Sequence, residues 1–159
     1  MKSYQRESNS SLPLANMVDI SEKPVIRREA TAEGTIFLKE STIDLIERGK
    51  IEKGDPLQIA TVGGIQAVKS TPNSLMMCHP VPVESTKVKF VRGKNSFTVS
   101  VTVVAFSKTG VEMDALNGVT AALLNIWDVV KKYEKDSGGQ YPSTKIEGIR
   151  IIAKIKGPR

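Results

Sequence analysis

Residues 107–135, SKTGVEMDALNGVTAALLNIWDVVKKYEK, predict one long helix around which the rest of the chain is arranged. Thr109 and Glu112 have the spacing of a capping box, so we expect the helix to begin there. A second line of residues, from Met113 through Leu124 to Asp128, predicts burial on two sides of the helix. The first apolar stripe recurs at helical spacing and comprises Ala115, Leu116, Val119, Ala122, Leu123, Ile126, Trp127 and Val130.

The second line ends in charged residues. Asp128 and Lys131 lie three positions apart and therefore share a face of the helix. On most helices such a pair is a solvated ion pair worth about a few tenths of a kcal/mol. The small and apolar residues before Asp128 on the same side favour a second interpretation, the edge of a cleft or of a subunit contact. There a carboxylate beside a lysine would tune an acid–base group.

Two further helices are predicted before this one. Residues 40–48 form a short amphipathic pattern that ends at Gly49, a common helix terminator. Asp55 followed by Pro56 has the form of an N-cap and first helical position, which predicts a helix to about Ser70. Paired glycines in this second helix would permit the close approach of another backbone.

The strands are predicted from alternation. Residues 25–38 form an extended segment broken at Gly34, and residues 86–92 and 97–105 form a hairpin that turns at 93–95. Residues 149–156 predict a last strand with a cationic row, including Lys154, on its exposed side. Helices on one face of a largely antiparallel sheet, an α+β fold, explain this order of elements.

Composition limits the class of protein. The 159 residues suffice for one domain, which we place at 17–159 after a flexible, polar N-terminal arm at 1–16. A net charge of +6 suits a polyanionic partner, whether a nucleotide triphosphate, a nucleic acid or an acidic protein. The single cysteine, Cys78, excludes an internal disulfide and fits a reducing compartment. With no membrane-length apolar run and no signal core, a cytoplasmic protein is expected.

Few residues suggest chemistry by their type alone. His79 is the only histidine, and zinc requires three or four N, S or O ligands, so no metal site is expected. A hydrogen-bonding or phosphate-contacting role for His79 is more plausible, and Cys78 is better explained as a small buried side chain than as a nucleophile. A P-loop is rejected because Ser107 and Thr102 stand where that motif needs glycine. Glu112 would favour the N–H donors of a ligand ring over a phosphate.

Several segments in order resemble the cyclic pyranopterin monophosphate synthase family, the molybdenum cofactor biosynthesis protein C family. The KTGVEM segment at 108–113, followed by the Asp128 and Lys131 pair, is the most diagnostic. The resemblance covers about residues 17–156. Its other matching pieces are MVDIS at 17–21 with Lys23 and Arg28, KGD at 53–55, GIQA at 64–67 with Lys69, and CHP at 78–80.

The resemblance implies a lyase that converts 3′,8-cyclo-7,8-dihydro-GTP to cyclic pyranopterin monophosphate and releases pyrophosphate. It also implies a ferredoxin-like fold and a homo-hexamer, a trimer of dimers, with sites at subunit contacts. Mg²⁺ that accompanies the triphosphate is a possible cofactor. By the same resemblance Asp128, Lys131 and Lys53 are catalytic; Met77, Cys78, His79, Glu112 and Met113 bind substrate; and Arg28, Lys69 and Lys154 face the triphosphate.

The main alternative is a small basic RNA-binding module on a ferredoxin-like sheet. Such modules stack bases on exposed strand aromatics. Here Phe90 and Phe97 alternate in phase with valines, which assigns them to the core and disfavours this alternative. The chain also departs from the family at Ser107, often glycine there, and in its tail, residues 155–159. We therefore assign no tail lysine a role beyond that of Lys154.

Overall fold

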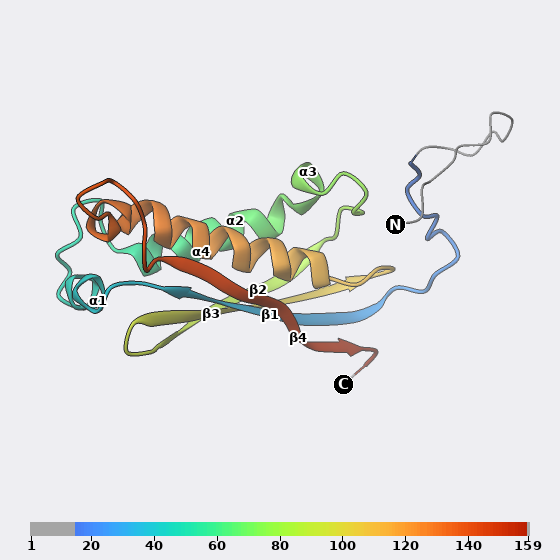
Figure 1. Cartoon of the computed structure of the whole chain (residues 1–159). Coiled ribbons are helices and arrows are strands. Elements are labelled where there is room, and N and C mark those ends of the chain that lie inside the picture. Colours follow the sequence, from blue (N-terminus) through green and yellow to red (C-terminus); the bar gives the residue numbers. More distant parts are fainter. Residues whose placement is uncertain (1–14, 159) are drawn as a thin grey trace, which may run out of the picture.

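A computed structural model describes residues 15–158 (Figure 1). The predicted N-terminal arm, residues 1–16, lies outside this range except for its last two residues. In the described part of the chain the elements are β1 (Ile26–Phe37), α1 (Glu40–Glu47), α2 (Pro56–Lys69), α3 (Thr71–Ser74), β2 (Val83–Arg92), β3 (Ser96–Ser107), α4 (Glu112–Glu134) and β4 (Lys145–Lys156). None of these helices is both long enough and apolar enough to cross a lipid bilayer.

The four strands form one sheet in the order β2-β3-β1-β4, and every neighbouring pair is antiparallel. The helices α2 and α4 lie side by side on one face of this sheet, as Figure 1 shows. This is the strand order of a ferredoxin-like fold, so the predicted α+β class is confirmed. The predicted hairpin is also confirmed: β2 and β3 pair in register from Arg92 opposite Phe97.

The core lies between the sheet and α4. Alternate residues of β3 from Phe97 to Ala105 are buried and meet the first apolar stripe of α4, from Ala115 to Val130. Burial of each large apolar side chain stabilises the fold by about 1.5–3 kcal/mol. Phe97 is only 4% exposed and Phe90 packs against this core. Neither aromatic side chain is therefore available to stack on a nucleic-acid base.

Glycines allow α2 to cross α4 closely. A Cβ atom on Gly118 would lie 2.6 Å from Cγ2 of Val68 and 3.3 Å from the carbonyl oxygen of Gly64. Glycine is a poor helix former, yet Gly118 makes room here for the neighbouring helix. Asn117 joins the same contact by donating to the carbonyl of Ala67 at 2.9 Å. The predicted second buried side is thus covered by α2, but Leu124 beyond it stays 55% exposed in the single chain.

The predicted capping box is wrong. The helix α4 begins at Glu112, and its N-cap, Val111, makes no side-chain cap. Glu112 pairs instead with Lys154 of β4, and the Thr109 N–H donates to the hydroxyl of Ser107. An ion pair to a neighbouring strand has therefore replaced a local backbone contact. Nothing in the local spacing of residues 107–113 revealed that strand.

The predicted break at Gly34 is also wrong, because β1 runs through it without interruption. The irregularity lies in the pairing with β4, whose register shifts between Glu33 and Thr35. A Cβ atom on Gly34 would lie 2.8 Å from Cδ1 of Leu123 and 2.9 Å from Cγ1 of Ile149. The glycine thus lets α4 and β4 approach the strand and does not end it.

The predicted alternation of β4 fails for a related reason. A second register shift, between Thr31 and Ala32, leaves Ile152 as an extra residue in the strand. Lys154 therefore lies opposite Ala30, which is buried on the helix side of the sheet. The row of cations predicted on the exposed side is wrong: Lys154 points toward the beginning of α4, where it meets Glu112.

Candidate functional site

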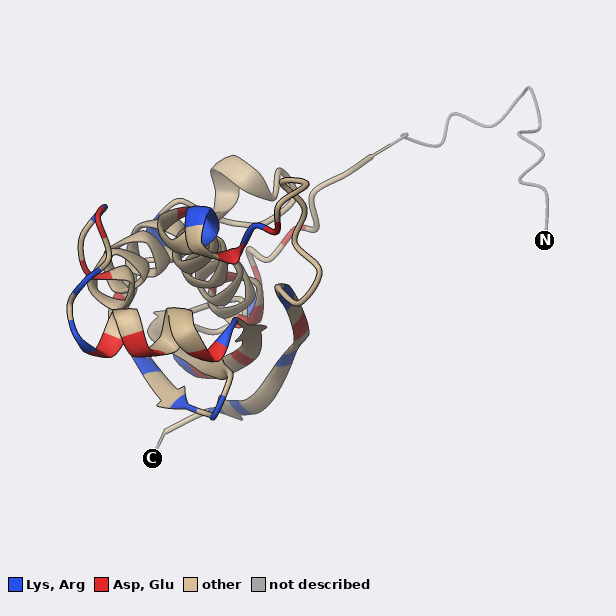
Figure 2. Cartoon of the chain, turned by 60° about the vertical axis from the view of Figure 1, so that its left-hand side comes forward, with Lys and Arg blue, Asp and Glu red and all other residues tan. Residues whose placement is uncertain are grey.

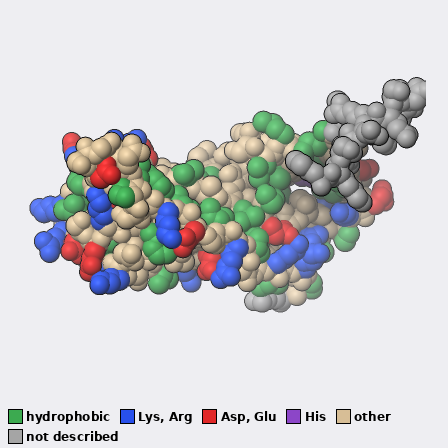
Figure 3. Space-filling model, in the orientation of Figure 1, with side chains coloured by type: hydrophobic (Ala, Val, Ile, Leu, Met, Phe, Trp, Pro, Cys, Tyr) green, Lys and Arg blue, Asp and Glu red, His purple; other side chains and the backbone are tan. Residues whose placement is uncertain are grey.

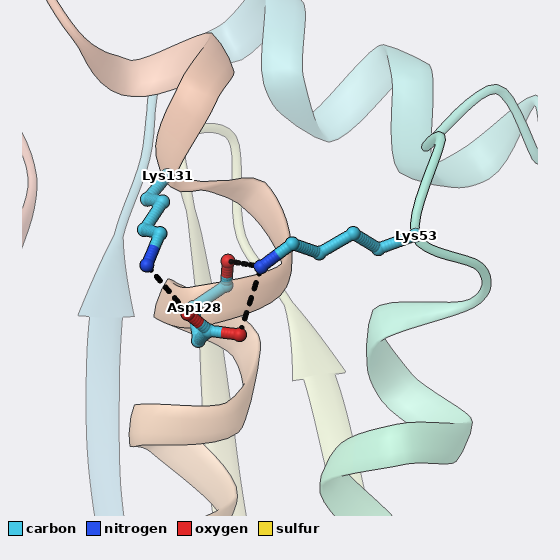
Figure 4. Close-up of polar contacts among 3 residues, drawn as sticks. All are labelled: Lys53, Asp128 and Lys131. Carbon is cyan, nitrogen blue, oxygen red and sulfur yellow. Dashed lines mark hydrogen bonds and ion pairs between the residues drawn. The ribbon is translucent and has the colours of Figure 1, made fainter.

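Lys53, Asp128 and Lys131 meet near the C-terminal end of α4, and we call them the aspartate–lysine cluster (Figure 4). Lys53 extends from the loop between α1 and α2, and its Nζ lies 2.9 Å from Oδ2 of Asp128 and 3.0 Å from the Asp128 carbonyl oxygen. The Nζ of Lys131 lies 2.7 Å from Oδ1 of the same carboxylate. All three side chains remain about half exposed, so a substrate can reach them.

The electrostatics of this cluster fix its charge state. The hydrogen bond from Lys131, and then the one from Lys53, lower the pKa of Asp128 to about 2. The same contact with Asp128 raises the pKa of Lys131 above its usual value. At neutral pH the cluster is thus a carboxylate held between ammonium groups. Lys131 in this state can donate a proton, and Asp128 can hold and orient the cation that does so.

We predict that Lys131→Gln raises the pKa of Asp128 toward its ordinary value of 3.8, because the largest cause of its lowering is removed. Since the folded-state pKa is below the ordinary one, the ion pairs are complete above about pH 4 and are lost as the pH falls through about 2. An NMR titration of the Asp128 carboxyl carbon measures both values. Lys94→Gln, a distant charge loss, should leave that midpoint in place. An unchanged midpoint in Lys131→Gln would contradict the assignment.

A second group of predicted residues surrounds a cavity of about 690 Å³ at the other end of α4, which we call the basic cavity. It lies where β1, β4, the loop before β2 and the turn after β3 meet the first turn of the helix. Figure 3 shows basic side chains at this end of the molecule, beside acidic ones, and further basic side chains at the opposite end. The lining residues are Asn16, Val18, Ile20, Lys23, Pro24, Arg28, Met77, Cys78, His79, Lys108, Thr109, Gly110, Glu112, Met113, Asp114, Lys154 and Lys156.

The basic cavity is suited to an anion. Arg28 is only 9% exposed, and it donates to two backbone carbonyls, those of Ser107 at 3.4 Å and Lys108 at 3.3 Å. Within the described residues no carboxylate pairs with this buried guanidinium. Burial of a charge without a counter-ion is costly. A bound anion that can accept from arginine would supply the missing charge.

The two carboxylates of the cavity differ in environment. Burial would raise the pKa of Glu112, but the hydrogen bond and charge of Lys154 outweigh it and lower that pKa. Asp114 is only 5% exposed, and burial raises its pKa although a hydrogen bond with Thr71 acts against the shift. Glu112 is thus already neutralised by a lysine. Asp114 has no ion-pair partner among the described residues, so its carboxyl group can still interact with a ligand.

Burial, and then the nearby charge of Asp114, raises the pKa of the Cys78 thiol. A raised pKa keeps the sulfur protonated at neutral pH, whereas a nucleophilic cysteine needs the thiolate. The raised pKa disfavours Cys78 as a nucleophile, and the side chain is partly buried in the cavity lining and not fully buried as expected. His79 lies beside it in the same lining. The described residues contain no group of three His, Cys, Asp or Glu side chains placed to hold a metal ion.

The structure brings together all but one of the predicted substrate-binding residues. Lys69 is the exception: it is exposed at the end of α2 and does not line the cavity. Asp114, Lys108 and Lys156 line it without having been predicted as site residues. An acidic residue in the first turn of a helix is usually explained by the helix dipole, so the sequence does not mark Asp114 as a site residue. Only the placement of the loop before β2 shows that it faces the cavity.

The two groups do not meet within one chain. Glu112 at the cavity and Asp128 in the aspartate–lysine cluster are 16 positions apart on the straight helix α4. At about 1.5 Å per residue, about 24 Å separate them along its axis. Figure 2, in which the C-terminal end of α4 comes forward, shows acidic and basic segments interspersed at that end. A single chain therefore presents a cationic binding cavity and an acid–base cluster at opposite ends of one helix.

Comparison with known proteins agrees with the resemblance. A probable cyclic pyranopterin monophosphate synthase of Pyrococcus abyssi is 51% identical over 140 residues, which cover 88% of each chain. One of Sulfolobus acidocaldarius is 51% identical over 88% of this chain and 98% of its own. A protein of Methanothermobacter thermautotrophicus named a probable accessory protein of that synthase is 52% identical over 88% of each chain. The family model described as the MoaC family matches residues 17–157. This chain therefore belongs to the MoaC family.

Proposed function

We propose that the protein is a cyclic pyranopterin monophosphate synthase, a lyase of molybdenum cofactor biosynthesis. It converts 3′,8-cyclo-7,8-dihydro-GTP to cyclic pyranopterin monophosphate and releases pyrophosphate. The observation that carries the proposal is the basic cavity, whose buried Arg28 has no carboxylate partner among the described residues. Relatives about half identical to this chain have the corresponding name.

In this proposal the basic cavity binds the substrate. Its volume of about 690 Å³ is within the range of about 300–1,000 Å³ that holds small ligands. Arg28, Lys108 and Lys154 face the triphosphate and stabilise the departing pyrophosphate. The ring system binds to Asp114, to Glu112 and to the loop that carries His79. Carboxylate oxygens can accept hydrogen bonds from the N–H groups of such a ring. The role of Lys69 at the triphosphate stays a prediction, since it lies outside the cavity lining.

The aspartate–lysine cluster supplies the acid–base chemistry. Ring opening and closure require protons to move between ring nitrogens, oxygens and carbons, and lysine side chains within reach can perform such transfers. Lys131 is held as the ammonium by Asp128, so it carries a proton at neutral pH. Lys53 approaches the same carboxylate from the other side. Asp128 holds both amino groups toward the substrate.

The cavity and the cluster act on one substrate only if two copies of the chain contribute. About 24 Å of α4 separates them, so we infer that the cavity of one subunit faces the cluster of its partner. A two-fold axis then generates two such sites per pair of subunits. Apolar side chains remain exposed on the outer sides of α2 and α4, Val62 and Leu124 among them. A homo-hexamer built as a trimer of dimers, with sites at subunit contacts, is the expected assembly.

Two further expectations stay predictions. Mg²⁺ can accompany the triphosphate, and phosphate oxygens would then supply most of its ligands, since Glu112 is already paired with Lys154. The cytoplasm, as a reducing compartment, is the expected location for a chain with one cysteine.

The proposal is tested by incubating the purified, assembled protein with 3′,8-cyclo-7,8-dihydro-GTP. We expect release of pyrophosphate together with formation of the pterin product, and no release from GTP, which lacks the cyclised ring. Light scattering on the same sample verifies the assembly. If an assembled protein formed no product from a verified substrate, the lyase function would be rejected. Salt-dependent binding of RNA would then be measured as the alternative.

A further inference from the structure

The loop that carries Lys53 is anchored on both sides. Ile51 is only 7% exposed and belongs to the core, and the Gly54 N–H donates to the Ile51 carbonyl at 3.1 Å to close a tight turn. Gly54 has a φ of +109°, a conformation that favours glycine. Directly after it, Asp55 caps α2 by accepting from the N–H of Leu57 at 2.8 Å. The backbone around Lys53 is thus held at each end.

Tyr133 holds the middle of this loop. Its hydroxyl oxygen accepts the backbone N–H of Glu52, the residue before Lys53, at 3.0 Å. Lys132 forms an ion pair with the Glu52 side chain, and its Nζ lies 5.1 Å from the centroid of the Tyr133 ring. Both residues follow Asp128 by little more than one turn of α4. The helix that presents Asp128 therefore also holds the loop that delivers Lys53.

The Tyr133 hydroxyl contributes little to packing. The ring packs against the core, and a phenylalanine ring would do the same. The Glu52 N–H lies at the surface, so water can satisfy it when the hydroxyl is lost, at little cost in stability. The hydroxyl instead fixes the position of the backbone next to Lys53. Lysine has a long, flexible stem, and where its ammonium lies depends on where its backbone is held.

We propose that Tyr133, assisted by Glu52 and Lys132, is a positioning residue that holds Lys53 in reach of Asp128 and of the substrate. Its effect on turnover rests on the proposed function, whereas its effect on the loop does not. A misplacement of about 1 Å in a catalytic group can cost about 100-fold in rate. Removal of one hydroxyl that does not line the basic cavity should therefore lower kcat without weakening the binding of substrate.

The test uses Tyr133→Phe in the full-length protein. We expect kcat to fall roughly 10- to 100-fold while KM and the melting temperature stay close to wild type. Trypsin cleavage after Lys53, followed by mass spectrometry, should become faster because the loop opens more often. Thr120→Val on the same helix is the matched control, since among residues 15–158 the Thr120 hydroxyl bonds only to the Leu116 carbonyl, at 2.8 Å. This control should change neither kcat nor cleavage after Lys53.

The outcomes separate the possible failures. Wild-type kcat and wild-type cleavage in Tyr133→Phe would overturn the proposal. A lower melting temperature with unchanged kcat would also overturn it, because it would give Tyr133 a purely structural role. If wild-type protein forms no product from the cyclised substrate, the proposed function fails. The cleavage comparison then still decides whether Tyr133 holds the loop.

Discussion

Asp128→Asn is expected to remove turnover while the fold and the assembly stay intact. Asparagine has nearly the same shape as aspartate, but it lacks the charge that forms ion pairs with Lys53 and Lys131. Removal of a group that organises proton transfer typically costs about 10²–10⁴-fold, and we expect a loss of about 10³-fold in kcat. The Asp128 side chain is 58% exposed, so its ion pairs contribute little to stability.

The measurement compares kcat with circular dichroism and light scattering for each variant. Lys131→Ala should behave like Asp128→Asn, because it removes one of the two lysine partners of Asp128. Lys94→Ala is the surface control, since the Lys94 side chain is 80% exposed and its nearest carboxylate, on Glu40, lies 3.8 Å away. Near-normal turnover in Asp128→Asn would remove Asp128 from the mechanism. If Lys131→Ala and Lys94→Ala both changed kcat by the same small amount, Lys131 would be interpreted as part of a solvated ion pair without a catalytic role.

Activity should return when two inactive variants are combined in one oligomer. Asp128→Asn leaves the basic cavity intact, and Arg28→Gln leaves the aspartate–lysine cluster intact. Gln can still donate to the backbone carbonyls that Arg28 meets, but it supplies no charge to the triphosphate. If each site takes its cavity from one chain and its cluster from another, one of the two sites in a mixed pair is wild type. When equal amounts of the variants pair at random within the oligomers, about half of the pairs are mixed. About one quarter of all sites, and so of wild-type activity, is then restored.

The experiment uses two tags, co-expression and tandem purification, so that only mixed oligomers are assayed. The matched control combines Asp128→Asn with Lys131→Ala, two changes in the same cluster, and should restore nothing. Each variant purified alone should be inactive. Verified mixed oligomers of Asp128→Asn and Arg28→Gln that stay inactive would reject a site shared between chains. Both groups of residues would then need another explanation.

Local patterns predicted most of the elements. The α2 start is an example: Asp55 accepts the N–H groups of Leu57 and Gln58, as an N-cap followed by proline predicts. The spacing of Asp128 and Lys131 likewise placed both on one helix face, where they now form an ion pair. These features depend on residues a few positions apart. Helix geometry or turn chemistry alone brings such residues together.

The errors share one cause, which is a contact with a distant element. Glu112 does not cap α4 because Lys154, 42 positions away, offers it a charge. Gly34 does not break β1, because the missing Cβ makes room for Leu123 and Ile149. The alternation of β4 fails at a register shift that depends on its pairing with β1. Spacing within a segment carries no information about such partners.

The sequence by itself determined the fold class, the long helix, the hairpin, the family and the types of side chain available for chemistry, since these follow from periodicity, turn residues and motif order. Only the tertiary structure decided how those side chains are grouped. It brings Lys53 into contact with Asp128, which lies 75 positions away in the sequence. It buries Arg28 without a carboxylate partner among the described residues, and it places Asp114 in the lining of the basic cavity. It also separates that cavity from the aspartate–lysine cluster by the length of α4. The physical reason is that burial and charge pairing depend on distances between segments, and those distances exist only once the helices have packed on the sheet.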